Sequence, residues 1–160
     1  MTIVPGLREL VSLLPGRWAV AATNLPTWLD GERREPGFAF EVVSTDPLVL
    51  ADDVTFTTVD GEEKHFVGLS TQRADGSFKR RGRGKKRFMS NKWRVMGASE
   101  DGTILAIRYA ESRVVPEGID IVVREGHSYP ELRAMIAHTT TQYGLSPEDF
   151  GSLSWFAPRS

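Results

Sequence analysis

Hydrophobic and polar residues alternate with a period of two along most of the chain. Eight segments show this alternation: 17–24, 38–45, 53–60, 64–73, 77–88, 92–99, 103–110 and 118–125. Side chains on a strand point alternately to its two faces, so each segment predicts a β-strand. Most of the links between them are short and contain Gly, Asn or Asp, which is typical of tight turns. The pattern therefore predicts an antiparallel meander.

The two ends of the chain follow helical periodicity instead. Apolar residues of segment 7–14 fall on one side of a 3.6-residue period, which predicts a short helix within a lead-in over residues 1–15. Residues 128–143 carry an apolar stripe that begins with the Ser-x-x-Glu spacing of a capping box. We expect a helix over 128–143 and a brief last strand over 152–156.

This order of elements predicts a single domain, residues 1–160, built around a closed barrel. Closure removes the edges that an open eight-stranded sheet would expose, and eight strands leave room for one small ligand. The expected fold class is mainly β. It is an eight-stranded antiparallel up-and-down barrel over residues 16–125, with a C-terminal α-helix packed on the wall and a short ninth strand.

Residues at both ends of the predicted barrel resemble the lipocalins of the calycin superfamily, particularly the bacterial branch. Gly16-Arg17-Trp18 matches the Gly-x-Trp motif of the family's first strand, and residues 119–156 are similar to the family's final strand, helix and strand. The resemblance implies a lipocalin-like barrel that binds and transports a hydrophobic ligand. It also implies that Gly16, Trp18 and Arg124 form a structural motif in which the arginine lies across the indole. Such a cation–π contact contributes about 0.5–2 kcal/mol.

Composition narrows the possible functions. The chain has 40% hydrophobic residues, 26% charged residues, a formal net charge of -1 and no cysteine. A near-neutral chain is not a general nucleic-acid binder, so such a role would be local. The missing cysteines exclude disulfides, thiol nucleophiles and thiolate-bound metals. With no basic leader and no apolar run of about 20 residues, we expect a cytoplasmic protein without membrane insertion. The oligomeric state is not indicated.

The run Lys79–Arg87 contains only basic residues and glycines. On a strand, Arg80 and Lys86 would share the inward face with Phe78 and Phe88. One interpretation is a solvated basic edge, in which both charges extend to water. Another places one of them at the cavity, where it would select a carboxylate or phosphate group. A third is a nucleic-acid or protein-binding module, although aromatic residues bracket this run and do not punctuate it.

These features predict a site for a small, mainly hydrophobic or amphipathic molecule. The molecule would carry an acidic head group if Arg80 or Lys86 faces the cavity. Trp28, in the long polar segment 25–37, resembles a lid over the open end of a lipocalin barrel. The residues that we expect to bind the ligand are Trp28, Phe40, Phe56, Phe66, Arg80, Lys86 and Trp93.

No sequence motif predicts catalysis or a metal site. The pairs Asp52-Asp53 and Glu62-Glu63 lie near predicted turns, and we interpret them as solubilising residues. The histidines are not spaced like metal ligands. An alternative is a haem-binding barrel similar to the nitrobindins, in which a histidine such as His127 or His138 would be the axial ligand. A small-molecule enzyme on the same fold also stays open, but the sequence favours a binding protein that requires no cofactor.

Overall fold

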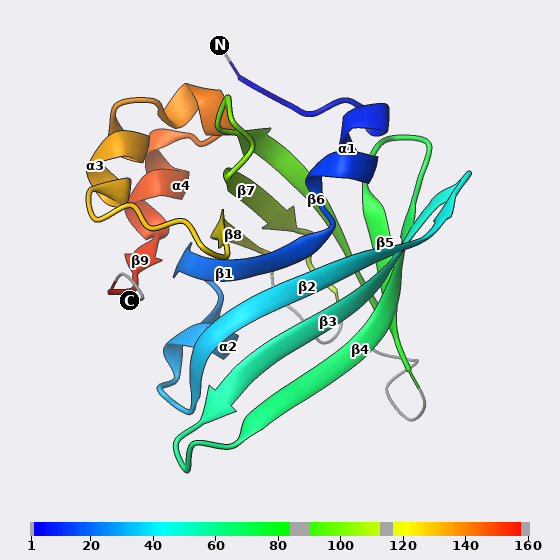
Figure 1. The fold of residues 1–160 in the computed structure, drawn as a ribbon. Coiled ribbons are helices and arrows are strands. Elements are labelled where there is room, and N and C mark those ends of the chain that lie inside the picture. The colour runs from blue at the N-terminus through cyan, green and yellow to red at the C-terminus, as the bar shows by residue number, and fades with distance from the viewer. Residues whose placement is uncertain (1, 84–89, 113–116, 158–160) are drawn as a thin grey trace.

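Eight antiparallel strands close into a barrel, and a ninth strand is bonded outside the ring (Figure 1). This computed structural model describes residues 2–83, 90–112 and 117–157. Pairing of β1 with β2 closes the ring, and each later strand pairs with the next, back to β1. The barrel strands are β1 (Gly16–Thr23), β2 (Arg33–Thr45), β3 (Leu48–Thr58), β4 (Glu63–Gln72), β5 (Phe78–Gly82), β6 (Ser90–Ala98), β7 (Ile104–Tyr109) and β8 (Gly118–Arg124).

Short helices flank the barrel. They are α1 (Leu7–Leu13) before β1, α2 (Pro26–Leu29) between β1 and β2, and, after β8, α3 (Leu132–Ala137), the 3-10 helix η2 (Thr140–Tyr143) and α4 (Pro147–Ser152). The ninth strand, β9 (Ser154–Trp155), pairs with the end of β1. None of the helices in the described part of the chain has the length and hydropathy needed to cross a bilayer.

Trp18 and Arg124 close the end of the barrel that α1 covers. The guanidinium carbon of Arg124 lies 4.3 Å from the centre of the Trp18 ring. Arg124 donates hydrogen bonds to the main-chain carbonyls of Leu13, the last residue of α1, and of Pro15 just after it. The Trp18 indole N–H donates to the carbonyl of Leu14 at 2.9 Å. The stacking expected from the Gly-x-Trp motif is therefore present, and it ties the barrel floor to α1.

Apolar side chains form two cores on the two faces of the wall made by β7, β8 and β1. Inside the barrel, Leu105 of β7 and Val122 of β8 belong to one core. On the outer face, Ile121 belongs to a second core together with Leu132 and Ile136 of α3. Because both faces are covered, β7 and β8 are buried at nearly every position.

The strand boundaries differ from the prediction on one side of the barrel. β3 begins at Leu48, five residues before the expected start, because Asp46-Pro47 forms the turn from β2. β2 begins at Arg33, inside the predicted loop. A register shift between Arg34 and Gly37 lets the strand accommodate Pro36, which cannot donate a ladder hydrogen bond.

The C-terminal helix is shorter than expected. The predicted helix over 128–143 is divided into α3 and η2, and Glu131 precedes α3 without a side-chain cap. The capping box lies instead at α4, where Ser146 and Asp149 exchange hydrogen bonds of 3.0 Å. β5 ends at Gly82, and residues 84–89 of the predicted strand 77–88 lie outside the described residues.

Candidate functional site

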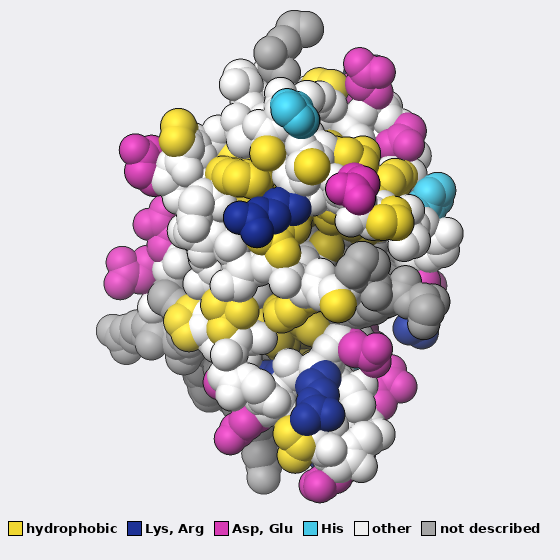
Figure 2. All heavy atoms as spheres, turned by 90° about the vertical axis from the view of Figure 1, so that its left-hand side faces the viewer, with side chains coloured by type: hydrophobic (Ala, Val, Ile, Leu, Met, Phe, Trp, Pro, Cys, Tyr) yellow, Lys and Arg dark blue, Asp and Glu magenta, His cyan; other side chains and the backbone are white. Residues whose placement is uncertain are grey.

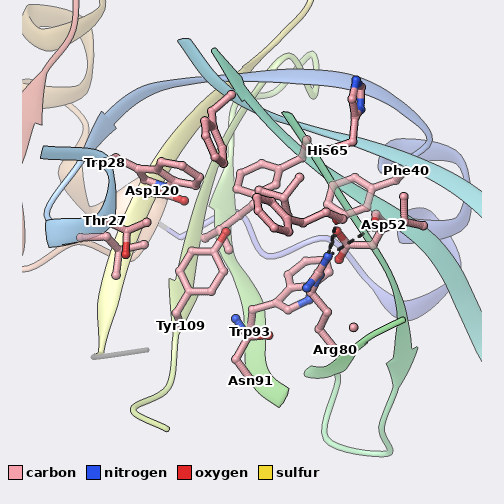
Figure 3. Close-up of a pocket in the computed structure, with 18 of the residues that line it drawn as sticks. Thr27, Trp28, Phe40, Asp52, His65, Arg80, Asn91, Trp93, Tyr109 and Asp120 are labelled. Atoms are coloured by element: carbon pink, nitrogen blue, oxygen red, sulfur yellow. Dashed lines mark hydrogen bonds and ion pairs between the residues drawn. The ribbon is translucent and has the colours of Figure 1, made fainter. Parts of the chain in front are cut away.

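A cavity of about 590 Å³ lies inside the barrel, toward the end opposite α1 (Figure 3). Figure 2 looks onto this end and shows hydrophobic side chains within its hollow. Apolar side chains make up most of the wall, and its aromatic residues are Trp28, Phe38, Phe40, Phe56, Phe66, Trp93 and Tyr109. A cavity of this size and lining is typical of sites for small organic molecules.

Most of the residues expected from the sequence come together here. The cavity is lined by Trp28, Phe40, Phe56, Phe66, Arg80 and Trp93. Lys86 lies outside the described residues. The role of all seven predicted residues in ligand binding stays a prediction. The lining residues that were not expected include Phe38, Asp52, Tyr109 and Asp120.

Trp28 reaches the cavity from α2, at the open end. Its side chain is buried, and its ring centre lies 6.1 Å from that of Phe56 on β3. The proline at the start of α2 suits the first turn of a helix, where its missing N–H costs no hydrogen bond. Trp28 therefore lines the cavity from α2, and its role as a lid stays a prediction.

A row of stacked rings joins Phe40 on β2 to Trp93 on β6 and Phe78 on β5. The ring centres of Phe40 and Trp93 are 5.5 Å apart, and those of Phe78 and Trp93 are 4.4 Å apart. The indole N–H of Trp93 donates to Ser70 Oγ at 3.0 Å, and this hydroxyl donates to Asp52 Oδ2 at 2.8 Å. The aromatic row is thereby connected to a buried carboxylate.

Asp52 forms an ion pair with Arg80 at the cavity wall (Figure 3). Arg80 Nε lies 3.1 Å from Asp52 Oδ1, and the two side chains are only 15% and 4% exposed. Arg80 Nη2 also donates to the carbonyl of Phe66 at 2.7 Å. A Cβ atom at Gly68 would lie 3.1 Å from the guanidinium carbon, so the glycine leaves room for Arg80. Burial raises the pKa of Asp52 above its usual value, although Arg80 and Ser70 lower it.

This pair corrects two interpretations of the sequence. Asp52 is not a turn residue, because β3 extends through it and its side chain points inward. The alternation of Leu48, Leu50, Asp52, Val54 and Phe56 was the signal that could have placed it there. Arg80 is neither a solvated edge residue nor an unpaired cation, because Asp52 compensates its charge.

Asp120 lies on the opposite wall, on β8, beside Trp28 and Tyr109 (Figure 3). The residue is fully buried, and burial raises the pKa of its carboxyl to about 7, although Thr23, Tyr109 and Trp28 lower it. Two positions before Val122 and four before Arg124, it shares their inward face. That spacing was the available signal, but it lies in a run that is apolar on both faces.

The outward residues of β5 form a separate surface. Lys79, Arg81 and Arg83 flank a shallow groove with Leu69 of β4 on the outside of the barrel. Arg80 of this run faces the cavity, and Lys85, Lys86 and Arg87 lie outside the described residues. Nucleic-acid or protein binding by this run stays a prediction.

The histidine positions do not suit a haem in the cavity. His127 stacks on Tyr129, with 6.4 Å between ring centres, and His138 follows α3, so both lie outside the barrel. His65 is at the cavity rim, but its ring lies between Asp53 at 2.8 Å and Glu63 at 3.2 Å. The described residues contain no group of three side chains that could hold a metal ion.

No protein-family model matches the sequence, and no curated protein is significantly similar to it. Solved structures, in contrast, match over nearly the whole chain. Lobster apocrustacyanin A1 superposes with a TM-score of 0.61 at 9% identity, over 99% of this chain and 92% of that one. The siderocalin Ex-FABP gives 0.61 at 10% identity, over 92% and 96% of the two chains. The odorant-binding protein OBP1 gives 0.60 at 13% identity, over 98% and 95%.

These three proteins are lipocalins, so the comparison agrees with the resemblance in the Gly-x-Trp motif and Arg124. At identities of 9% to 13%, the likeness shows the fold alone. The chain has the lipocalin fold.

Proposed function

We propose that this barrel binds one small, mainly apolar molecule in its cavity. The observation that carries the proposal is the cavity of about 590 Å³ with its mainly apolar wall, which contains seven aromatic side chains. Burying about 300 Å² of apolar ligand surface would contribute about 7 kcal/mol, from which the cost of lost ligand freedom is subtracted. Apolar burial alone would correspond to a Kd of about 10 μM before that cost is subtracted.

The structural neighbours support this class of function. One of them is an odorant-binding protein, and another is a siderocalin described as having dual ligand specificities. Both share the fold of this chain, and an eight-stranded barrel can hold one small ligand inside it. Transport of the ligand and a cytoplasmic location stay parts of the proposal, and both need tests in cells.

An acidic head group is not required by the described part of the cavity. That expectation depended on an uncompensated cation, and Arg80 is paired with Asp52 at 3.1 Å. A second anion beside this pair would compete with Asp52 for the same guanidinium. An acidic ligand would therefore gain less here than the sequence suggested.

A fluorescent probe tests the proposal directly. N-phenyl-1-naphthylamine is neutral and apolar, and its emission rises when it leaves water. We expect saturable binding of one molecule per chain, and native mass spectrometry of the purified protein should show any molecule that it retains. Absence of saturable probe binding to the folded protein would overturn the proposal.

A matched pair of variants locates the binding site. Val54→Phe adds a ring at a cavity-lining position, whereas Val43→Phe adds the same ring to an exposed position on β2. We expect about tenfold weaker probe binding for Val54→Phe and no change for Val43→Phe. Equal probe affinity in both variants would show that the probe binds elsewhere.

A further inference from the structure

The two buried carboxylates of the cavity differ in their partners. Asp52 has Arg80 and Ser70, and it lies on the β3 to β5 side. Asp120 lies on β8, across the ring from β4, and Figure 3 shows it on the other side of the cavity from that pair. The barrel therefore holds a compensated charge on one wall and a second carboxyl on the facing wall.

Neither carboxyl oxygen of Asp120 has a hydrogen-bond partner of normal geometry among the described residues, and neither is exposed to water. The polar groups around it are the hydroxyls of Thr23 and Tyr109 and the indole of Trp28. Thr23 Oγ1 already accepts a hydrogen bond from the Leu25 amide at 2.9 Å, so its own hydrogen can turn toward the carboxyl. A fully buried carboxyl with such poor satisfaction is costly, and it needs a physical explanation.

The position of Asp120 explains why a poorly satisfied carboxyl is buried there. Trp28 and Tyr109, its immediate neighbours, line the cavity, and Asp120 itself lines it. A ligand group that inserts between these two rings would therefore meet the carboxyl. Arg80 and Arg33 cannot compensate its charge, because each is engaged by its own carboxylate, at 3.1 Å and 2.9 Å.

We propose that Asp120 binds the positively charged amino group of an amphipathic ligand, at the α2 side of the cavity. This inference rests on the proposed ligand-binding function and specifies its ligand class. An ammonium donates to both carboxyl oxygens and compensates the charge, which no neutral or acidic group does. The apolar part of the ligand would then extend along the aromatic wall toward Phe40 and Trp93.

Titration of this site gives the interaction a pH dependence. Burial raises the pKa of Asp120 to about 7, while burial also holds the pKa of Tyr109 well above its usual value, so Tyr109 stays neutral. The other charged groups around the cavity are the Asp52 and Arg80 pair, the Arg33 guanidinium, Arg83 and His65. An amine should bind more tightly at pH 8 than at pH 6, because the carboxyl is then ionised before binding.

Three probes with one apolar body test the ligand class. Decylamine, decanol and decanoate each compete with N-phenyl-1-naphthylamine for the wild-type protein at pH 8. We expect decylamine to compete at least about tenfold better than decanol, and decanoate to be the weakest. Equal competition by decylamine and decanol, or a preference for decanoate, overturns the inference. This comparison needs no variant.

Two isosteric variants assign the preference to one residue. Asp120→Asn should abolish the advantage of decylamine over decanol, with both ligands measured by displacement of the probe from the same variant. Asp53→Asn makes the same chemical change at a carboxyl that pairs with His65 and does not line the cavity, so it should keep the advantage. If Asp120→Asn keeps the advantage while the probe still binds, the amine site is wrong and the proposed function stands. If the wild-type protein does not bind the probe, the proposed function fails as well.

Discussion

A Cβ atom at Gly16 would lie 2.6 Å from Nη1 of Arg124. The backbone of Gly16 also has a φ of 116°, which L side chains rarely adopt. The first residue of the Gly-x-Trp motif is therefore a glycine for two reasons: the chain turns there, and the guanidinium that covers Trp18 occupies the space of a side chain.

Gly16→Ala should lower the free energy of unfolding by about 2–3 kcal/mol, because it combines backbone strain with displacement of Arg124. Urea unfolding followed by tryptophan fluorescence measures this. Gly151→Ala is the control, since nothing lies within 4 Å of a Cβ atom there. Alanine in that helix should leave the stability unchanged or raise it by up to about 1 kcal/mol. A loss no larger than that of the control would contradict the proposed constraint.

Removing the charge of Arg80 alone should destabilise the protein more than removing the charges of both Asp52 and Arg80. Arg80→Met leaves a buried carboxylate without its cation and should cost about 3 kcal/mol of stability. Asp52→Asn combined with Arg80→Met removes both charges, and we expect it to recover at least half of that loss. Chemical denaturation of the two variants at pH 8 decides the comparison, and equal losses would mean that the pair is not coupled.

Asp120 should make the wild-type protein less stable as the pH rises. Its folded-state pKa of about 7 lies above the unfolded value near 3.8. The folded state therefore holds a proton that the unfolded state has released between these values, so the free energy of unfolding falls from pH 4 to pH 7. Relative to Asp120→Asn, the wild type should lose about 2–3 kcal/mol between pH 5 and pH 8. Asp52 contributes a similar pH dependence to both proteins, so subtracting the variant from the wild type cancels it. Parallel curves of stability against pH for the two proteins would contradict the assignment to Asp120.

His65 should titrate above the usual histidine range. Its ring nitrogen lies 2.8 Å from Asp53, and this hydrogen bond and the Asp53 charge raise its pKa. NMR titration of the imidazole signals measures the value, and Asp53→Asn should lower it. A His65 signal that does not respond to Asp53→Asn would show that the contact is absent in solution.

The sequence predicted the fold because its signals are local. Alternation along single strands can be recognised without knowledge of the register, whereas the contact of Trp18 with Arg124 was expected from the resemblance to the lipocalins. The predicted start of β2 was wrong because Pro36 indicated a loop. The strand includes this proline because the register between β2 and β3 shifts there.

The polar part of the site could not be found in the same way. Asp52 and Arg80 are 28 residues apart and meet only because β3 and β5 lie on either side of β4. Asp52 was interpreted as a turn residue because Asp53 follows it. Asp120 was missed because it lies in an apolar run whose outer face is covered by the C-terminal helices. Partner identity for a buried charge depends on pairing in three dimensions, which a single sequence does not give.

The second core behind β7, β8 and β1 makes the barrel unequal in thickness around its circumference. The backed half carries Asp120, whereas the half formed by β2 to β5 is a single layer with Val43, Val67 and Leu69 open to water on its outside. We therefore expect a wider ligand to push the single-layered side, β2 to β5, outward, while the side covered by the C-terminal helices keeps its shape.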